Sequence, residues 1–213
     1  EFFPERDGYV SEKANIIKNL KPRGTAVLNY DDLSVREFRD RVPSGRSRIY
    51  YGFQEGADVR ISDFSYNIPV SCEEIEKSGM EFKVEYFGES TGGGELLEST
   101  SSKIEKTIGV PPLYAVLAGI AVGTAFGIKI KDSAKSLEKF SAPKNRLELL
   151  KGVKNTIIIN DSYNSSPVAC EAALDLLSKF KKQRKIAVLG SMRELGKNTE
   201  EAHRMIGKKA SKI

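Results

Sequence analysis

The sequence is poor in the residues that build covalent or metal-bound frameworks. Its 213 residues include one histidine, two cysteines and no tryptophan. A single histidine excludes a multi-histidine metal site, and Cys72 and Cys170 are too far apart to suggest a zinc motif or a disulfide framework. Unpaired cysteines are typical of a reducing compartment, so we expect a cytoplasmic protein.

Long apolar segments are also missing. No apolar signal segment follows Glu1. The uncharged stretch 111–128 is interrupted by prolines and glycines and is shorter than the roughly 20 apolar residues of a spanning helix. We therefore expect a buried helix and no membrane span. Because the chain starts without methionine and ends at Ile213 inside a predicted helix, we also expect a fragment of a longer protein.

The composition gives no sign of disorder or low complexity. Hydrophobic residues make up 39% and charged residues 30%, as in an ordinary globular protein of one large or two small domains. The net charge of +5 fits a solvated surface or a site for an anionic ligand such as a phosphate. No nucleic-acid-binding motif accompanies this charge, so we expect no nucleic-acid partner.

Helices and strands mix in the first part of the chain. Hydrophobic spacing predicts a helix over 11–20 that is capped by Ser11, a buried strand at Thr25–Asn29 and a helix over 34–41. A β-rich stretch follows, with strands expected at 48–53, 59–66, 80–87 and 95–100. The apolar helix over 113–130 and a short helix over 132–140 complete this region.

Strand and helix alternate after a connector at 141–145. We expect a strand at 156–159, a helix from the cap Ser166 to Phe180, a strand at Lys185–Leu189 and a last helix from Asn198 with a capping box at Glu201. This order predicts an α/β fold with a parallel sheet and right-handed crossovers. We therefore divide the chain into two domains, 1–141 and 142–213.

Two segments are candidates for phosphate or nucleotide contacts. Gly190–Thr199 resembles a P-loop, but five residues separate its glycines where the motif requires four, and Asn198 follows the lysine, so we reject it. Asn160–Pro167 follows a predicted strand, at the edge where parallel sheets carry ligand sites. A carboxylate there can accept hydrogen bonds from a ribose, although the segment also fits an ordinary turn and helix cap.

The polar segment Asn160–Pro167 and later residues of the chain resemble motifs of a known family. Asp161-Ser-Tyr-Asn-Ser-Ser-Pro167, then Val188-Leu-Gly-Ser-Met-Arg-Glu-Leu-Gly196 and His203, resemble the start of the C-terminal domain of the Mur ligases, in the pattern of the MurF branch. Glu12-Lys13-Ala14 and the run Ala26-Val-Leu-Asn-Tyr-Asp-Asp32 are similar to motifs of the central ATPase domain. The resemblance implies the C-terminal part of that domain, followed by the start of a Rossmann-like parallel α/β domain.

The resemblance also implies a reaction. Mur ligases use ATP and Mg²⁺ to convert a carboxylate into an acyl phosphate, which an amine then attacks to form an amide. The MurF branch joins D-alanyl-D-alanine to UDP-N-acetylmuramoyl-tripeptide in peptidoglycan precursor synthesis. Because no P-loop is present, we expect this chain alone to be inactive. Two alternatives stay open, namely another Mur-ligase-like ligase for a different acid and amine, and a non-catalytic nucleotide-binding or scaffold module.

Family roles can be assigned to four residues near the nucleotide. Lys13 would stand where several members carry a carbamylated lysine that holds a Mg²⁺ ion; otherwise it is a surface lysine. Arg146 matches the arginine after the interdomain connector, and with Asp161 would hold the base and ribose across the domain junction. Asn29 lies in the strand-end motif and would contact the nucleotide. A linker charge and a helix cap are the plainer interpretations of Arg146 and Asp161.

Three further residues would line the substrate side. The resemblance places Tyr163 and Asn164 near the phosphates and the incoming dipeptide, and His203 in the same region, although a helix histidine also fits a structural role. The sequence departs from the family at Pro111, Pro112 and Ala115, where most relatives carry the residues that meet the adenine. This departure puts the usual adenine contact in doubt.

Overall fold

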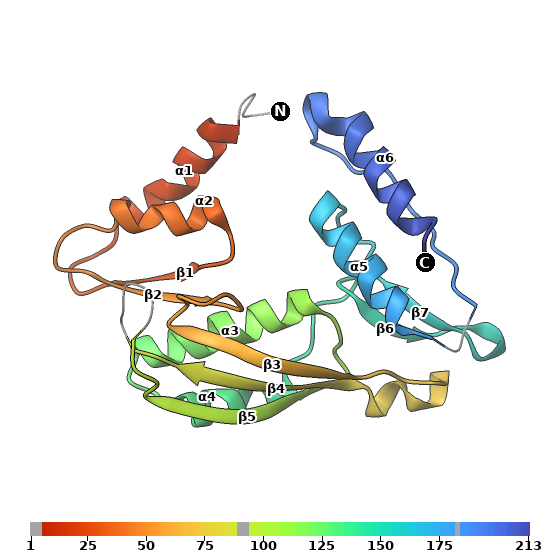
Figure 1. Cartoon of the computed structure of the whole chain (residues 1–213), viewed down its shortest axis with the longest axis horizontal. Helices are drawn as coiled ribbons and strands as arrows, with labels where there is room; N and C mark the ends of the chain where they lie inside the picture. The colour runs from red at the N-terminus through yellow and green to blue at the C-terminus, as the bar shows by residue number, and fades with distance from the viewer. Residues whose placement is uncertain (1–5, 89–93, 182–183) are drawn as a thin grey trace. The chain divides into compact units, whose positions relative to one another are not determined.

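A computed structural model describes residues 6–88, 94–181 and 184–213 of the chain (Figure 1). The α-helices are α1 (Arg6–Lys18), α2 (Leu33–Arg36), α3 (Val110–Ala125), α4 (Ile130–Ser136), α5 (Pro167–Lys179) and α6 (Thr199–Ala210). The strands are β1 (Thr25–Asn29), β2 (Ser47–Gly52), β3 (Val59–Asn67), β4 (Gly79–Tyr86), β5 (Glu98–Glu105), β6 (Glu148–Lys151) and β7 (Ile157–Asn160). Short 3-10 helices follow α2 and α4 and precede β4, β7 and α6.

The chain separates into two compact units. Unit 1 consists of residues 1–64, 82–103 and 114–138, and unit 2 of residues 65–81, 104–113 and 139–213. The chain therefore passes between the units several times. The division into domains at 141/142 stays a prediction.

Parallel strands form the first part of the larger sheet. The sheet has the order β1-β2-β3-β4-β5, and β1 pairs parallel with β2 from Thr25 opposite Ser47 to Asn29 opposite Tyr51. β2 continues parallel to β3, with Tyr51 opposite Val59. The carboxyl ends of β1 and β2 therefore lie side by side, which is the edge where ligands bind in parallel α/β sheets.

Helices cover β1 and β2 in unit 1. Figure 1 shows α1 and α2 on the same side of these strands. Ala14 of α1 packs with Ala26, Leu28 and Tyr50 in one buried cluster. Ile49, the neighbour of Tyr50, is also buried, and successive residues of a strand point to opposite faces. Both faces of β2 are therefore covered, as is usual for a parallel strand.

The most apolar helix, α3, is part of the core. Val116, Leu117 and Ile120 have no exposed surface, whereas Val122 is 45% exposed. Two prolines stand in the first turn of this helix, where their missing N–H groups leave no hydrogen bond unmade. Among the described helices, none is long and apolar enough to cross a membrane.

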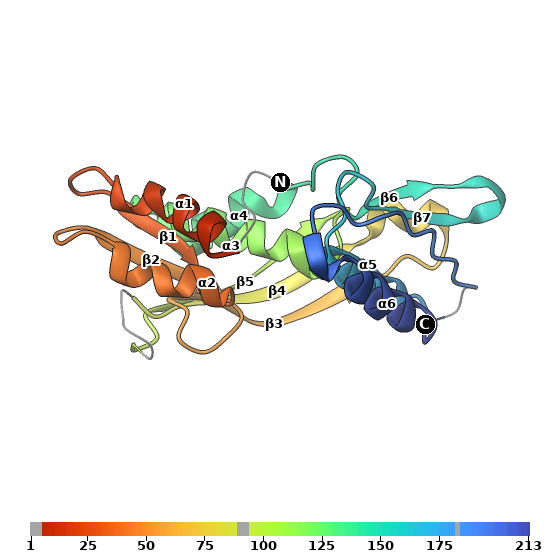
Figure 2. The ribbon, with the colours of Figure 1, turned by 90° about the horizontal axis from the view of Figure 1, so that it is seen from above.

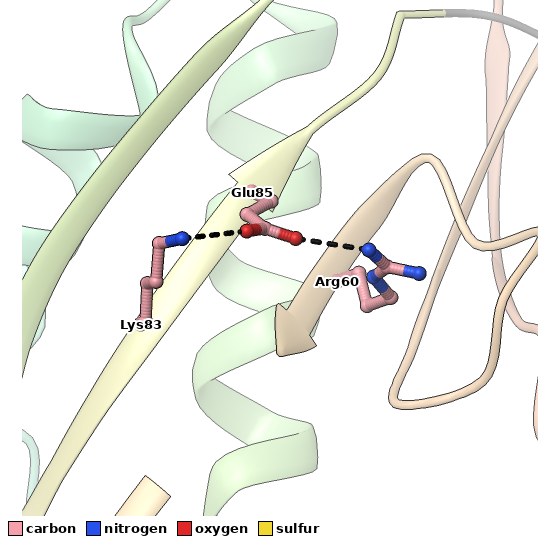
Figure 3. A network of polar contacts seen from close by, with 3 residues as sticks. All are labelled: Arg60, Lys83 and Glu85. Atoms are coloured by element: carbon pink, nitrogen blue, oxygen red, sulfur yellow. Dashed lines mark hydrogen bonds and ion pairs between the residues drawn. The ribbon is translucent and has the colours of Figure 1, made fainter. Parts of the chain in front are cut away.

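An acidic side chain is buried in the β-sheet of unit 1. Glu85 of β4 is 7% exposed and accepts hydrogen bonds from Lys83 Nζ at 2.8 Å and from Arg60 Nη2 at 3.0 Å (Figure 3). The Arg60 guanidinium also lies 4.7 Å from the centre of the Phe87 ring. The bond from Lys83, followed by that from Arg60, lowers the pKa of the Glu85 carboxyl against the effect of burial.

This network makes stability depend on pH. A carboxyl with a lowered pKa stabilises the fold above its ordinary pKa of 4.5, and the contribution is lost as the pH falls through the lower folded value. Between about pH 6 and about pH 3, the wild type should therefore lose more stability than Glu85→Gln does. Urea unfolding at both pH values measures the difference, and equal losses in the two proteins would contradict the assignment.

Unit 2 combines a β-hairpin with two packed helices. β6 and β7 pair antiparallel from Glu148 opposite Asn160 to Lys151 opposite Ile157, and Figure 2 shows them as one hairpin. Leu174 of α5 and Ile206 of α6 share a buried cluster with Met192 from the segment between these helices. Ser166 caps α5 by accepting a hydrogen bond from Ala169 N at 3.3 Å, as the sequence predicts.

Several sequence predictions about element ends and pairing are wrong. α1 begins at Arg6, so Ser11 lies inside the helix and does not cap it. Asn198 is the N-cap of α6, but its side chain makes no capping bond, and the Thr199 hydroxyl donates to Gly196 O at 2.7 Å instead. Glu201 therefore completes no capping box.

The strand expected at Lys185–Leu189 is absent from the described structure. Ile186 and Val188 are 68% and 93% exposed, and no described strand pairs with this segment. An isolated strand leaves its backbone hydrogen bonds unmade, so a run of apolar residues alone does not form one. β6, which the sequence did not predict, pairs with β7 in antiparallel orientation instead.

Candidate functional site

A tight turn in unit 2 presents Arg146. Arg146 N donates to Pro143 O at 3.2 Å, and the residues on either side of Arg146 have left-handed backbones, with φ of 61° at Asn145 and 50° at Leu147. The Arg146 guanidinium lies 4.3 Å from the centre of the Tyr163 ring. Both residues are exposed.

The residues that follow β7 are tied to this turn. Asp161 Oδ1 accepts a hydrogen bond from Leu147 N at 3.1 Å, and Tyr163 N donates to Asn145 O at 3.2 Å. The structure therefore brings together Arg146, Asp161 and Tyr163, three of the predicted site residues. Their roles toward a nucleotide or substrate stay predictions.

Two residues of the β6–β7 hairpin that bind Asn145 in this turn were not predicted as site residues. Asn160 Nδ2 donates to Asn145 Oδ1 at 2.8 Å, and Glu148 Oε2 accepts from Asn145 N at 3.0 Å. Asn160 ends a predicted strand next to the polar run, and Glu148 lies in the matched segment after the connector. These positions could have marked both residues as site candidates from the sequence. Only the folded hairpin shows that both bind Asn145.

The remaining substrate candidates make local contacts. Asn164 is exposed, and its Oδ1 accepts a hydrogen bond from Ser165 N at 2.8 Å. His203 Nε2 accepts from Met192 N at 3.0 Å, while its Nδ1 lies 2.7 Å from Thr199 O. These contacts require a neutral ring with the proton on Nδ1. The ring thus joins Met192 to α6, and a substrate role for His203 stays a prediction.

A second polar cluster lies at the carboxyl ends of β1 and β2 in unit 1. Asp31 accepts hydrogen bonds from Phe53 N at 2.7 Å, Gln54 N at 3.1 Å and the Tyr114 hydroxyl at 2.8 Å. Burial and the bond to the Asp31 carboxylate raise the pKa of the Tyr114 phenol strongly. Asn29 Oδ1 accepts from Asp31 N at 3.0 Å, so its amide orients the start of this loop.

The predicted metal ligand Lys13 is an exposed residue of α1. Its Nζ lies 5.3 Å from the centre of the Tyr9 ring. The described residues contain no group of three His, Cys, Asp or Glu side chains that could hold a metal ion. Asp32 next to the strand end caps α2, accepting from Ser34 N at 2.9 Å. The Mg²⁺ role of Lys13 therefore stays a prediction.

Comparison with known sequences decides the family. Residues 1–91 match the Mur ligase middle domain, and residues 145–213 match the Mur ligase glutamate ligase domain. The second match begins at Asn145, directly at the turn that presents Arg146. The chain belongs to the Mur ligase family. The two matched parts of this Mur ligase stand in the order that the motifs predict, and the α/β fold class is confirmed.

Three relatives illustrate where this Mur ligase stands in its family. The UDP-N-acetylmuramoyl-tripeptide–D-alanyl-D-alanine ligase of Bacillus subtilis is 39% identical over 114 residues, which cover 51% of this chain and 25% of that protein. The UDP-N-acetylmuramate–L-alanine ligase of Endomicrobium trichonymphae is 28% identical, covering 78% and 32% of the two chains. MurF ligase from Thermotoga maritima, solved in complex with ADP, is 26% identical with a TM-score of 0.75, covering 98% and 43%.

The matched part of the chain thus covers less than half the length of each of these relatives, from 25% to 43%. Within the Mur ligase, Pro111, Pro112 and Ala115 all lie in α3. Their side chains carry no hydrogen-bonding group, and the loss of the usual adenine contact stays a prediction.

Proposed function

We propose that this chain is part of a MurF-type ligase that joins D-alanyl-D-alanine to UDP-N-acetylmuramoyl-tripeptide in peptidoglycan precursor synthesis. The 39% identity to the Bacillus subtilis ligase of that specificity carries the proposal. The likeness to a MurF structure in complex with ADP supports a nucleotide as co-substrate. The proposal places the protein in the cytoplasm and makes the activity that of the full-length gene product.

The reaction proposed is amide formation at the expense of ATP. The tripeptide carboxylate attacks the γ-phosphorus, which gives an acyl phosphate and ADP, and the amine of D-alanyl-D-alanine then displaces inorganic phosphate. Mg²⁺ supplies charge neutralisation when bound. We propose Lys13 as a Mg²⁺ ligand only in its carbamylated form, because an ammonium group has no lone pair to offer a cation.

Arg146, Asp161 and Tyr163 together supply groups that suit a nucleoside. A guanidinium is planar and stacks on aromatic faces, and here that of Arg146 lies over the Tyr163 ring, 4.3 Å from its centre. We propose that its side away from Tyr163 stacks on a base. Asp161 uses Oδ1 for Leu147 N, which leaves Oδ2 to accept a hydrogen bond from a ribose hydroxyl. We propose that Asn29 contacts the nucleotide and that Tyr163, Asn164 and His203 contribute to substrate binding.

Removing the Arg146 side chain should weaken ATP binding by about tenfold, because a stacking surface and a charge are lost together. Asp161→Asn should weaken it by a similar factor, since the amide oxygen can still accept from Leu147 N while the charge is gone. Isothermal titration of the full-length gene product measures both affinities. Lys144→Ala is the control, because it removes an exposed cation of the same turn. Unchanged affinities in Arg146→Ala and Asp161→Asn would refute the nucleotide site.

A related ligase of different specificity is the second candidate. The Endomicrobium trichonymphae relative acts on UDP-N-acetylmuramate and L-alanine, and matches 78% of this chain. Product formation in a mixture of D-alanyl-D-alanine and L-alanine, each with its UDP-linked acid, separates the two activities. The departures at Pro111, Pro112 and Ala115 favour the third candidate, a non-catalytic nucleotide-binding or scaffold module, which would form neither amide.

A further inference from the structure

Arg146 lies between two residues with unusual backbones. Asn145 has φ of 61° and Leu147 has φ of 50°, both in the left-handed region. Asparagine adopts this region readily, whereas a leucine there is an outlier. Such conformations persist only where surrounding contacts fix them, and they gather at ligand-binding sites.

The contacts that fix this turn come from the hairpin. Leu147 is 5% exposed, and its N–H is bound by Asp161. Asn145 is held through three groups: its N–H donates to Glu148 Oε2 at 3.0 Å, its Oδ1 accepts from Asn160 Nδ2 at 2.8 Å, and its carbonyl accepts from Tyr163 N at 3.2 Å. Glu148 and Asn160 are directly opposite each other in the β6–β7 pair.

We propose that Glu148 and Asn160 are positioning residues that hold Asn145 and thereby aim Arg146 across the Tyr163 ring before the ligand arrives. The inference rests on the proposed function, since it gives Arg146 a nucleotide to meet. A side chain that is already ordered loses less conformational entropy on binding, so the turn contributes to affinity without touching the ligand. Glu148 and Asn160 act through Asn145 and are not catalytic residues.

Kinetics of the full-length gene product test the proposal. Glu148→Ala and Asn160→Ala should each raise KM for ATP by about tenfold and change kcat little, because they alter ground-state binding. Glu148→Gln should restore most of the affinity, since its amide oxygen can still accept from Asn145 N. A purely structural role would lower the Tm and leave KM for ATP unchanged, and that result would overturn the proposal.

A matched pair of asparagines controls for backbone strain. Asn155 also has a left-handed φ, 58°, and its Oδ1 accepts a hydrogen bond from Cys72 N at 3.0 Å, but it lies at the other end of the hairpin. Both Asn145→Ala and Asn155→Ala should lower the Tm. Only Asn145→Ala should raise KM for ATP, and a rise of the same size in Asn155→Ala would overturn the proposal.

A readout on the chain itself separates this inference from the proposed function. The Tyr163 ring current should shift the NMR signals of the Arg146 side chain upfield, because the guanidinium lies over the ring, 4.3 Å from its centre. Glu148→Ala should move these signals toward their positions in a free peptide, and Glu148→Gln should not. Signals that stay shifted in Glu148→Ala and Asn160→Ala would overturn the positioning role, even if the protein proves to be no ligase.

Discussion

Replacing Asp31 with alanine should lower the free energy of unfolding by about 3 kcal/mol, because three donors lose one shared acceptor. Phe53 N, Gln54 N and the Tyr114 hydroxyl all donate to this carboxylate within 2.7–3.1 Å. Phe53 and Tyr114 are half-buried, so the substitution leaves their donors without a partner at the carboxyl ends of β1 and β2, whereas the exposed Gln54 can bond to water. An unsatisfied donor costs more than the net gain of an ordinary hydrogen bond.

Tyr114→Phe is the matched test of how this energy is divided. It removes one of the three donors and keeps the edge-to-face contact with Phe53, whose ring centre lies 4.9 Å away. We expect a loss of about 1 kcal/mol. Because Asp31 and Tyr114 share a bond, the double variant should be more stable than the sum of the two losses predicts. Urea midpoints at constant slope measure all three variants, and equal losses in Asp31→Ala and Tyr114→Phe would contradict a shared carboxylate.

The elements that the sequence predicted well carry local signals. β1 is a run of apolar residues, and α5 begins with the cap Ser166 followed by Pro167, so each pattern is complete within a few residues. The strand predicted at 185–189 carries a local pattern too, but a strand also requires a partner. Local sequence cannot supply that information, and for the same reason the pairing of β6 with β7 was missed.

The residues of the candidate site show the same difference between local and long-range signals. Arg146, Asp161 and Tyr163 belong to short motifs, and the sequence therefore marked them out as candidates. The residues that position them act across distances that no motif spans: Asn160 reaches Asn145 over 15 positions, and Tyr114 reaches Asp31 over 83. A left-handed leucine at position 147 has no sequence signature at all, because the surrounding contacts impose it.

Leu117→Ala in α3 should lower the free energy of unfolding by about 2–5 kcal/mol. The Leu117 side chain has no exposed surface, so its removal forfeits buried contacts and leaves a cavity that a packed core fills only in part. Val122→Ala, on the same helix, should cost less than about 1 kcal/mol, because Val122 is 45% exposed. Guanidinium unfolding of the two variants measures both values.

This comparison tests what kind of helix α3 is. An apolar stretch of this composition is compatible with burial on one side or with apolar surroundings on all sides, and hydropathy alone does not separate these cases. If α3 is packed on one side only, truncating a buried side chain should cost more stability than truncating an exposed one. Equal losses at Leu117 and Val122 would mean that both faces are covered, and the burial pattern of α3 in unit 1 would then be wrong.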